Sequence, residues 1–170
     1  MTDVNANVKP DVKPNAAVTM TPAAAAGAAS AANPPRFANV QVGDTLPPVS
    51  VPPLSRTTLA LYAGASGDHV PLHIDQDVAR KAGMPDVFGH GMLTAAWLGR
   101  VLTGWVRQQQ IRSMELRFTG ITHLYNAITC TGRVTRKFEQ NGEQRVDLEI
   151  QAANQYGEQK IAGVATVALE

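Results

Sequence analysis

The chain has 170 residues, a length that suits one domain with an attached tail. Fifteen basic residues stand against fourteen acidic ones, without a basic patch, so nucleic acid is not an expected partner. A single cysteine, Cys130, excludes an internal disulfide framework and a multi-cysteine zinc site, and it indicates a reduced, cytoplasmic setting. The longest apolar run, residues 91–106, contains Arg100 and is too short to predict a membrane span.

Residues 1–36 are rich in Ala and Pro and lack the periodicity of a helix or a strand. Five prolines interrupt any helix that the Ala tract at 23–32 would start. No basic segment followed by a Leu- or Val-rich core precedes this tract, so a signal peptide is not predicted. We predict a disordered tail over residues 1–36 and a single domain over residues 37–170.

The next segment reads as an entry to the domain. Val40–Asp44 predicts a short strand and a turn. Two proline pairs within residues 47–53 fit an extended edge rather than a central strand. Ser55 is a suitable N-cap for a short helix that ends at Gly64 or Gly67.

Two further helices are predicted. Residues 75–81 indicate a short helix, ended by a following glycine and proline. Gly91–Arg107 is apolar on nearly all faces, and Arg100 is its only charge before the last turn. A helix of this kind is buried and must be wrapped by other elements, so Trp97 and Trp105 are predicted core residues.

Four segments after this helix alternate apolar and polar residues, which is typical of strands with one packed face. Asn141-Gly142 and Tyr156-Gly157 separate them as turns, so consecutive strands are antiparallel. The predicted fold class is α+β, with a curved antiparallel sheet wrapped around one long helix. Cys130 lies in the second segment as a small buried hydrophobe. The four segments are residues 114–118, 128–138, 146–152 and 161–169.

Polar groups gather in the stretch Leu61–Thr94, which holds three of the four histidines and five of the fourteen glycines. Asp68 and His73 lie five residues apart, and Pro71 between them predicts an extended loop rather than a continued helix. Gly-His-Gly at residues 89–91 then opens the apolar helix. The pattern indicates an acid/base pair together with a helix start that can stabilise an anion.

This stretch resembles a known family motif. Tyr-Ala-Gly-Ala-Ser-Gly-Asp-His-Val-Pro-Leu-His at residues 62–73, followed by Gly-His-Gly-Met-Leu-Thr at residues 89–94, resembles the hydratase 2 motif. That motif is the signature of MaoC-like dehydratases and (R)-specific enoyl-CoA hydratases, and it is similar to the β-type subunits of (3R)-hydroxyacyl-carrier-protein dehydratases. The resemblance extends from about residue 40 to the C-terminus. It implies a hot-dog fold, usually dimeric, in which a sheet wraps a long central helix.

The resemblance also implies roles for individual residues. Asp68 and His73 are the acid/base pair that shares a catalytic water, and the N–H of Gly91 points at the thioester oxygen. Together with Gly91, His90 and Ser66 are the residues expected to bind the oxyanion or the substrate. For His90 a structural role, capping the helix or packing beneath the loop, is favoured over substrate contact, and Ser66 is placed in support of the pair.

The predicted reaction is hydration of a trans-2-enoyl thioester or dehydration of a (3R)-3-hydroxyacyl thioester, on CoA or a carrier protein and without a cofactor. It needs a nucleophilic water at C3, a proton at C2 and stabilisation of the enolate oxygen. The family usually has Asn two residues after the catalytic Asp, where this chain has Val70. A valine side chain can neither orient water nor hold the loop by a hydrogen bond.

Other functions are less well supported. A hot-dog thioesterase commonly carries an acid on the central helix, and residues 91–106 contain none. A catalytically weakened partner subunit is consistent with Val70, but the intact acid/base pair argues against it. His69 and His73 straddle Pro71 rather than sharing a helix face, so no metal site is predicted. The dinucleotide and nucleophile-elbow motifs are missing from the sequence. A homodimer is the expected assembly.

Overall fold

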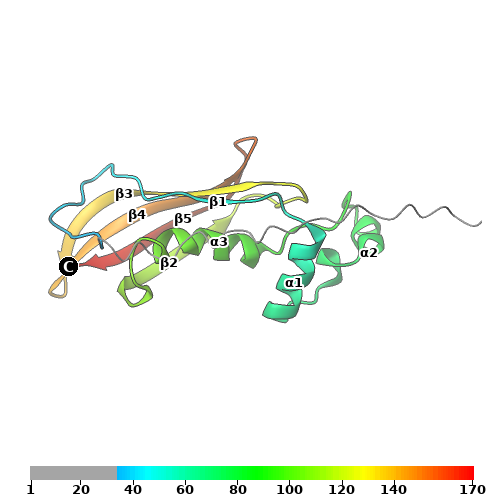
Figure 1. The fold of residues 1–170 in the computed structure, drawn as a ribbon, viewed down its shortest axis with the longest axis horizontal. Helices are drawn as coiled ribbons and strands as arrows, with labels where there is room; N and C mark the ends of the chain where they lie inside the picture. Colours follow the sequence, from blue (N-terminus) through cyan, green and yellow to red (C-terminus); the bar gives the residue numbers. More distant parts are fainter. Residues whose placement is uncertain (1–33) are drawn as a thin grey trace, which may run out of the picture.

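A five-stranded antiparallel sheet lies along one face of the helix α3, and two short helices stand beyond one end of the sheet (Figure 1). The structure is a computed structural model that describes residues 34–170, so most of the predicted tail lies outside the described residues. The strands are β1 (Val49–Val51), β2 (Ile111–Phe118), β3 (Ile128–Gln140), β4 (Glu143–Asn154) and β5 (Gln159–Leu169). The helices are α1 (Arg56–Ser66), α2 (Gln76–Lys81) and α3 (Gly91–Thr103), with 3₁₀ turns η1 (Pro71–His73) and η2 (Gln108–Gln110).

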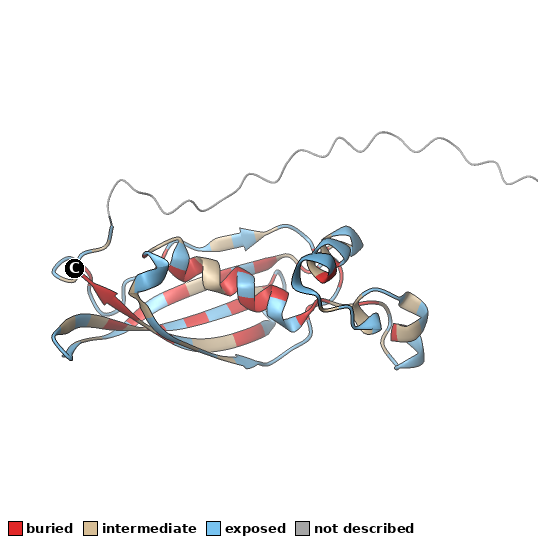
Figure 2. Ribbon diagram, turned by 90° about the horizontal axis from the view of Figure 1, so that it is seen from below, coloured by how far each residue is buried: buried red, intermediate tan, exposed pale blue. Residues whose placement is uncertain are grey.

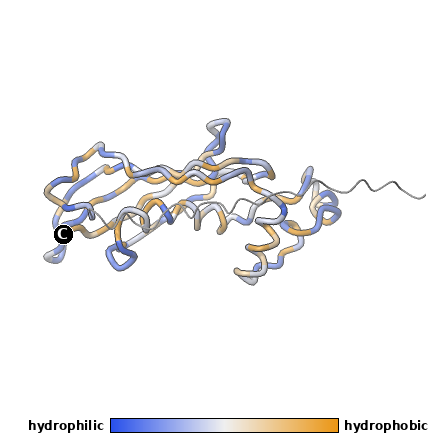
Figure 3. Tube along the Cα trace, viewed as in Figure 1, coloured by the Kyte–Doolittle hydropathy of each residue, from blue (hydrophilic) through white to orange (hydrophobic). Residues whose placement is uncertain are grey.

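The sheet has the strand order β1-β3-β4-β5-β2, and every pair is antiparallel. Asn141 and Gly142 join β3 to β4 with φ angles of 55° and 76°, the left-handed pair that a tight hairpin turn requires. Figure 3 shows apolar residues along the strands and α3, with polar residues at the loops that end the sheet. The four predicted strands and the α+β hot-dog architecture are confirmed.

The core lies between α3 and the inner face of the sheet (Figure 2). Leu98, Val101 and Leu102 of α3 are at most 1% exposed. Each such side chain contributes about 1.5–3 kcal/mol through burial. A Cβ on Gly132 of β3 would lie 3.3 Å from Val101 Cγ1, so the glycine lets the helix approach the sheet closely.

The helix α3 differs from its prediction in two ways. It ends at Thr103, with Gly104 as its C-cap, rather than at Arg107, and glycine is a poor helix residue. It is also not buried all round, since Met92 is 61% exposed and Ala96 is exposed as well. One face of the helix is therefore open to solvent in the single chain.

The entry segment was predicted incorrectly at one point. Of the strand and turn predicted over Val40–Asp44 only the turn forms, with Gly43 in the left-handed region at φ 100°. Its backbone nevertheless reaches β3, because the Gly43 N–H donates to the carbonyl oxygen of Val134 at 2.8 Å. The strand of this region is β1, between the two proline pairs and at an edge of the sheet, as the prolines predict.

The helices α1 and α2 begin and end where the sequence predicts. Ser55 caps α1 by accepting the Thr58 N–H, and Gly67 ends it with φ 74°. The Asp75 side chain caps α2 by accepting the N–H groups of Asp77 and Val78. Among residues 34–170, no helix is long and apolar enough to cross a membrane. The loops from α1 and α2 meet the start of α3, where the candidate site forms.

Candidate active site

Asp68 follows directly after the left-handed end of α1. The Ser66 hydroxyl donates to the Tyr62 carbonyl oxygen at 2.7 Å and accepts the Asp68 N–H at 3.2 Å. The Asp68 carboxylate in turn accepts the Val70 N–H at 3.3 Å through Oδ1. Ser66 thus lies at the backbone of Asp68, and a local Asx turn sets the carboxylate.

His73 sits on η1, and here the predicted extended loop is wrong. Pro71 begins a 3₁₀ turn, because its fixed φ and missing N–H suit the first position of a helix. The His73 Nδ1 lies 2.8 Å from the carbonyl oxygen of Phe88, so this nitrogen carries the proton and donates. The Nε2 lone pair is left available, which is the form of imidazole that can take a proton from water.

The loop that leads from α2 to α3 is held by Asp86. Burial raises the pKa of Asp86, but hydrogen bonds from the Val87 N–H and the Gln76 amide, together with the charge of Arg56, outweigh it and lower the pKa. Arg56 comes from the first turn of α1 and Gln76 from α2. The ionised carboxylate therefore ties both short helices to the segment that carries Phe88.

Gly89 anchors this segment to the loop before β3. Its N–H donates to the Thr122 carbonyl oxygen at 2.7 Å, and a Cβ there would come within 3.1 Å of Leu54 Cδ2 and of the same oxygen. The hydroxyls of Thr94 and Thr122 lie 3.0 Å apart and are buried. These contacts place the first turn of α3 against residues that follow β2.

His90 is the buried centre of the cluster, at 1% exposure. Its Nε2 donates to the carbonyl oxygen of Asp68 at 3.2 Å, and its ring lies 4.0 Å from the His73 ring at 31°. Burial first, and the neighbouring charge of His73 second, lower the pKa of His90. Although His90 precedes the first residue of α3, its side chain forms no capping hydrogen bond. Of the two structural roles predicted, packing beneath the loop is the one observed.

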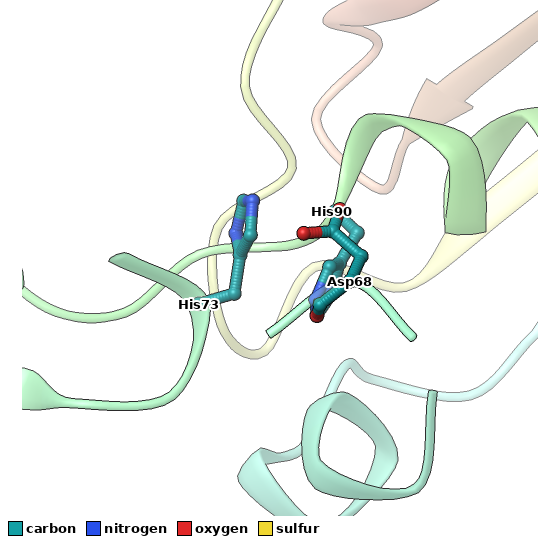
Figure 4. A group of neighbouring side chains, drawn as sticks. All are labelled: Asp68, His73 and His90. Atoms are coloured by element: carbon teal, nitrogen blue, oxygen red, sulfur yellow. The ribbon is translucent and has the colours of Figure 1, made fainter. Parts of the chain in front are cut away.

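Asp68, His73 and His90 converge in space (Figure 4). One carboxylate oxygen and one nitrogen of each ring all lie within 4.8 Å of one another. This spacing allows Asp68 and His73 to contact one water molecule between them. The structure thus brings the two residues of the predicted pair together, and their catalytic role stays a prediction.

The same three residues could hold a divalent cation by their spacing and donor types. In the described part of the chain, His73 Nδ1 and His90 Nε2 are already bonded to backbone carbonyls, which leaves one nitrogen on each ring. His90 Nδ1 is buried without a hydrogen-bond partner there. That the site works without a metal or a cofactor stays a prediction.

A cavity of about 310 Å³ opens beside His73 and the start of α3. Gly91 and Phe118 both line it, and a Cβ on Gly91 would lie 3.2 Å from Phe118 Cε1. As the first residue of α3, Gly91 has an N–H without a partner inside the helix, at the positive end of the helix dipole. Lys160 and Ile161 form another part of the wall, on β5. Asp68 does not line the cavity itself.

Comparison with known families decides the assignment. The MaoC-like domain family matches residues 8–155. The chain belongs to this family. Its fold is similar to that of a solved MaoC-like dehydratase, with a TM-score of 0.71 at 26% identity, covering 81% of this chain and 43% of that one. The R-hydratase PhaJ1 from Pseudomonas aeruginosa, in its unliganded form, superposes with a TM-score of 0.69 at 26% identity, covering 79% of this chain and 86% of that one.

Two curated proteins match shorter segments of this MaoC-like chain. The mitochondrial 3-hydroxyacyl-[acyl-carrier-protein] dehydratase of Arabidopsis thaliana is 32% identical over 89 residues, which is 52% of each protein. The 3-hydroxyacyl-thioester dehydratase X of Mycobacterium tuberculosis is 40% identical over 50 residues, 29% of this chain and 18% of that protein. The matches thus span about half or less of the curated relatives' lengths.

The part of the cavity wall that comes from β2, β5 and the loop after β2 was not predicted from the sequence. Phe118, Thr122 and Lys160 come from β2, the loop after it and β5, and no linear motif joins them to the stretch that carries Asp68. The other two histidines, His69 and His123, are exposed. The sequence held no signal for Lys160, because the alternation of residues 161–169 leaves position 160 outside the packed face, whereas the structure buries it.

Proposed function

We propose that this chain catalyses the reversible hydration of trans-2-enoyl thioesters, which is equivalent to dehydration of (3R)-3-hydroxyacyl thioesters. The convergence of Asp68 and His73 beside a cavity that starts at the N-terminus of α3 carries the proposal. Membership of the MaoC-like family and the likeness to a solved R-hydratase support a hydro-lyase.

The proposed chemistry follows from the atoms available. Asp68 and the free Nε2 of His73 bind one water between them; the pair removes one proton from it and returns one to C2. The hydroxide adds to C3 as the double bond electrons move towards the thioester carbonyl. The N–H of Gly91 donates to the oxygen that gains charge, and the helix dipole favours that charge. The product is the 3-hydroxyacyl thioester, with all atoms of water accounted for.

The thioester donor in this proposal is CoA or an acyl-carrier protein, and no cofactor takes part. We place the chain in the cytoplasm, consistent with its single buried thiol, Cys130. A homodimer is the proposed assembly. The competing thioesterase function is disfavoured because α3, Gly91–Thr103, contains no acidic residue.

The test is hydration of crotonyl-CoA and of longer enoyl-CoA esters, followed as loss of the enone absorbance. Asp68→Asn and His73→Gln should each lower the rate by at least about a hundredfold, because each removes one partner of the acid/base pair. His69→Ala is the matched control: the residue is an exposed histidine next to Asp68 and should leave the rate unchanged. Unchanged melting temperatures would show that the variants fold. Absence of hydration by the wild type across short and long chains would overturn the proposal.

A further inference from the structure

Lys160 is a buried cation in the wall of the candidate active-site cavity. It lies near the start of β5, and its side chain is only 6% exposed. Lysine is rarely buried to this extent unless a partner or a ligand compensates for the lost hydration of the ammonium. The neighbouring Ile161 shows that an apolar residue is accommodated in the same wall.

Its protein partner compensates only in part. Lys160 Nζ donates to Glu158 Oε2 at 2.9 Å, but the Glu158 side chain is 63% exposed and also accepts from the Asn154 amide at 2.8 Å. An ion pair with an exposed carboxylate contributes little, whereas burying the ammonium is costly. An ammonium has three N–H donors, and among residues 34–170 Glu158 is the partner that it has.

The cavity itself favours an anion. Among the described residues that line it there is no aspartate or glutamate, and Lys160 is the one permanently charged group. His73 and Gly91 lie on the side of α3, while Lys160 belongs to the sheet. The loop at Gly120 packs on the lysine stem, because a Cβ there would lie 3.4 Å from Lys160 Cδ. A positive group in a confined, largely apolar pocket selects an oppositely charged part of the ligand.

We propose that Lys160 binds a carboxylate on the acyl group, so that the preferred substrates are enoyl thioesters of dicarboxylic acids. This inference rests on the proposed function, because it takes the thioester to lie at Gly91. We assign the anion bound by Lys160 to the acyl group and not to the phosphates of the CoA. The full length of the pantetheine arm separates the CoA phosphates from the sulfur, so the phosphates lie well outside this cavity of about 310 Å³ when the thioester carbonyl is at Gly91.

The experiment compares the binding of glutaryl-CoA and pentanoyl-CoA by titration calorimetry. The two thioesters have equally long acyl chains that differ in a terminal carboxylate or methyl group, and neither has a double bond to hydrate. The wild type should bind glutaryl-CoA about tenfold more tightly, the typical effect of one charge-assisted hydrogen bond. Lys160→Met should remove this preference and leave pentanoyl-CoA binding within about twofold, because the apolar stem still fills the wall.

Two further variants make the result specific. Arg133→Met removes an exposed cation that lines a different cavity and pairs with exposed Glu149, so the preference should persist. Glu158→Gln removes the carboxylate that competes for Lys160, so it should tighten glutaryl-CoA binding. Because the Glu158 side chain is exposed, this variant should fold, and it tests the inference even where Lys160→Met does not fold.

Equal affinities of the wild type for the two thioesters would overturn the inference and leave the proposed hydratase function standing. If Lys160→Met weakened the binding of glutaryl-CoA and pentanoyl-CoA equally, the inference would also be overturned. Lys160 would then bind an anion of the CoA part or serve a general structural role. Failure to bind either thioester would contradict the proposed function as well.

Discussion

Val70 occupies the N-cap position of the 3₁₀ turn that carries His73, and its side chain forms no capping hydrogen bond. An asparagine there can accept an N–H of the turn, which is worth about 1 kcal/mol at helix starts. Val70→Asn should therefore hold His73 more firmly and raise kcat/KM for crotonyl-CoA hydration about fivefold. Steady-state kinetics of the two proteins measures the effect.

Val70→Thr separates capping from water binding. Threonine has nearly the shape of valine and supplies a hydroxyl that can cap the turn, but this hydroxyl does not reach as far as an amide. A gain shared by both variants would assign the effect to the turn, and a gain confined to asparagine would assign it to the water. No gain in either would show that the backbone N–H of Val70, already bonded to Asp68, is sufficient.

His90 makes folding sensitive to acid. Burial lowers its pKa from the ordinary value of 6.5, so the folded protein keeps it neutral while the unfolded chain takes up a proton. Stability from this group is complete above about pH 6.5 and falls as the pH decreases below that value, by at most about 1.4 kcal/mol per pH unit. Urea unfolding from pH 7 to pH 5 should show a shallower decline for His90→Gln than for the wild type. Parallel curves would contradict this account.

At the scale of elements, the start of α3 and the last turn of α1 offer a pair of glycines for comparison. Gly91→Ala adds a Cβ 3.2 Å from the Phe118 ring, at the place proposed for the thioester oxygen. It should lower kcat/KM at least about tenfold while the melting temperature changes little, because alanine is a good helix residue.

Gly64→Ala is the control for that substitution. Gly64 lies within α1, and no atom lies within 4 Å of an added Cβ. The free energy of unfolding should rise by about 0.5–1 kcal/mol with unchanged activity, since alanine loses less backbone entropy than glycine. Similar kinetic losses in both variants would indicate a general effect of glycine replacement and argue against an oxyanion contact at Gly91.

The elements that the sequence predicts well are those with a sustained period. The strands β3, β4 and β5 are 13, 12 and 11 residues long and carry alternating apolar residues over much of that length, and their hairpin turns carry glycine. The short elements lack that redundancy. Val40–Asp44 alternates for only a few residues, which a turn with tertiary hydrogen bonds accommodates equally well. At Pro71, the sequence excludes a continuing α-helix, but the ring also favours starting a new turn, and that second effect prevails.

The residues of the candidate site also fall into a group that the sequence predicts and a group that it does not. Asp68, His73, His90 and Gly91 are close in sequence, so local chemistry and the family motif suffice to group them. The cavity wall depends on which strand lies beside α3. Phe118 is paired with Ile161 through the register of β2 and β5, and this register brings Lys160 to the loop at Gly120. Such contacts follow from the assembled sheet and not from any single segment.

At the scale of the whole molecule, the two edges of the sheet are unlike. The edge strand β1 has three residues and is flanked by prolines, which prevent further pairing. The opposite edge strand β2 has eight residues, and within residues 34–170 only β5 pairs with it. Exposed apolar side chains lie near its end and at the start of α3: Met92, Phe118 and Ile121. An open edge beside exposed apolar surface is suited to pairing with a second copy.

The proposed homodimer should therefore form through β2. Light scattering should give twice the mass of one chain, and hydrogen exchange should show slow exchange along the whole of Ile111–Phe118. About half of these amides point away from β5 in an antiparallel pair, and in a monomer they exchange with solvent. Val49–Val51 serves as the internal reference, because its outer amides have no expected partner in either state. A dimer whose outward β2 amides exchange as fast as those of β1 would place the interface elsewhere, and a single-chain mass would refute the dimer itself.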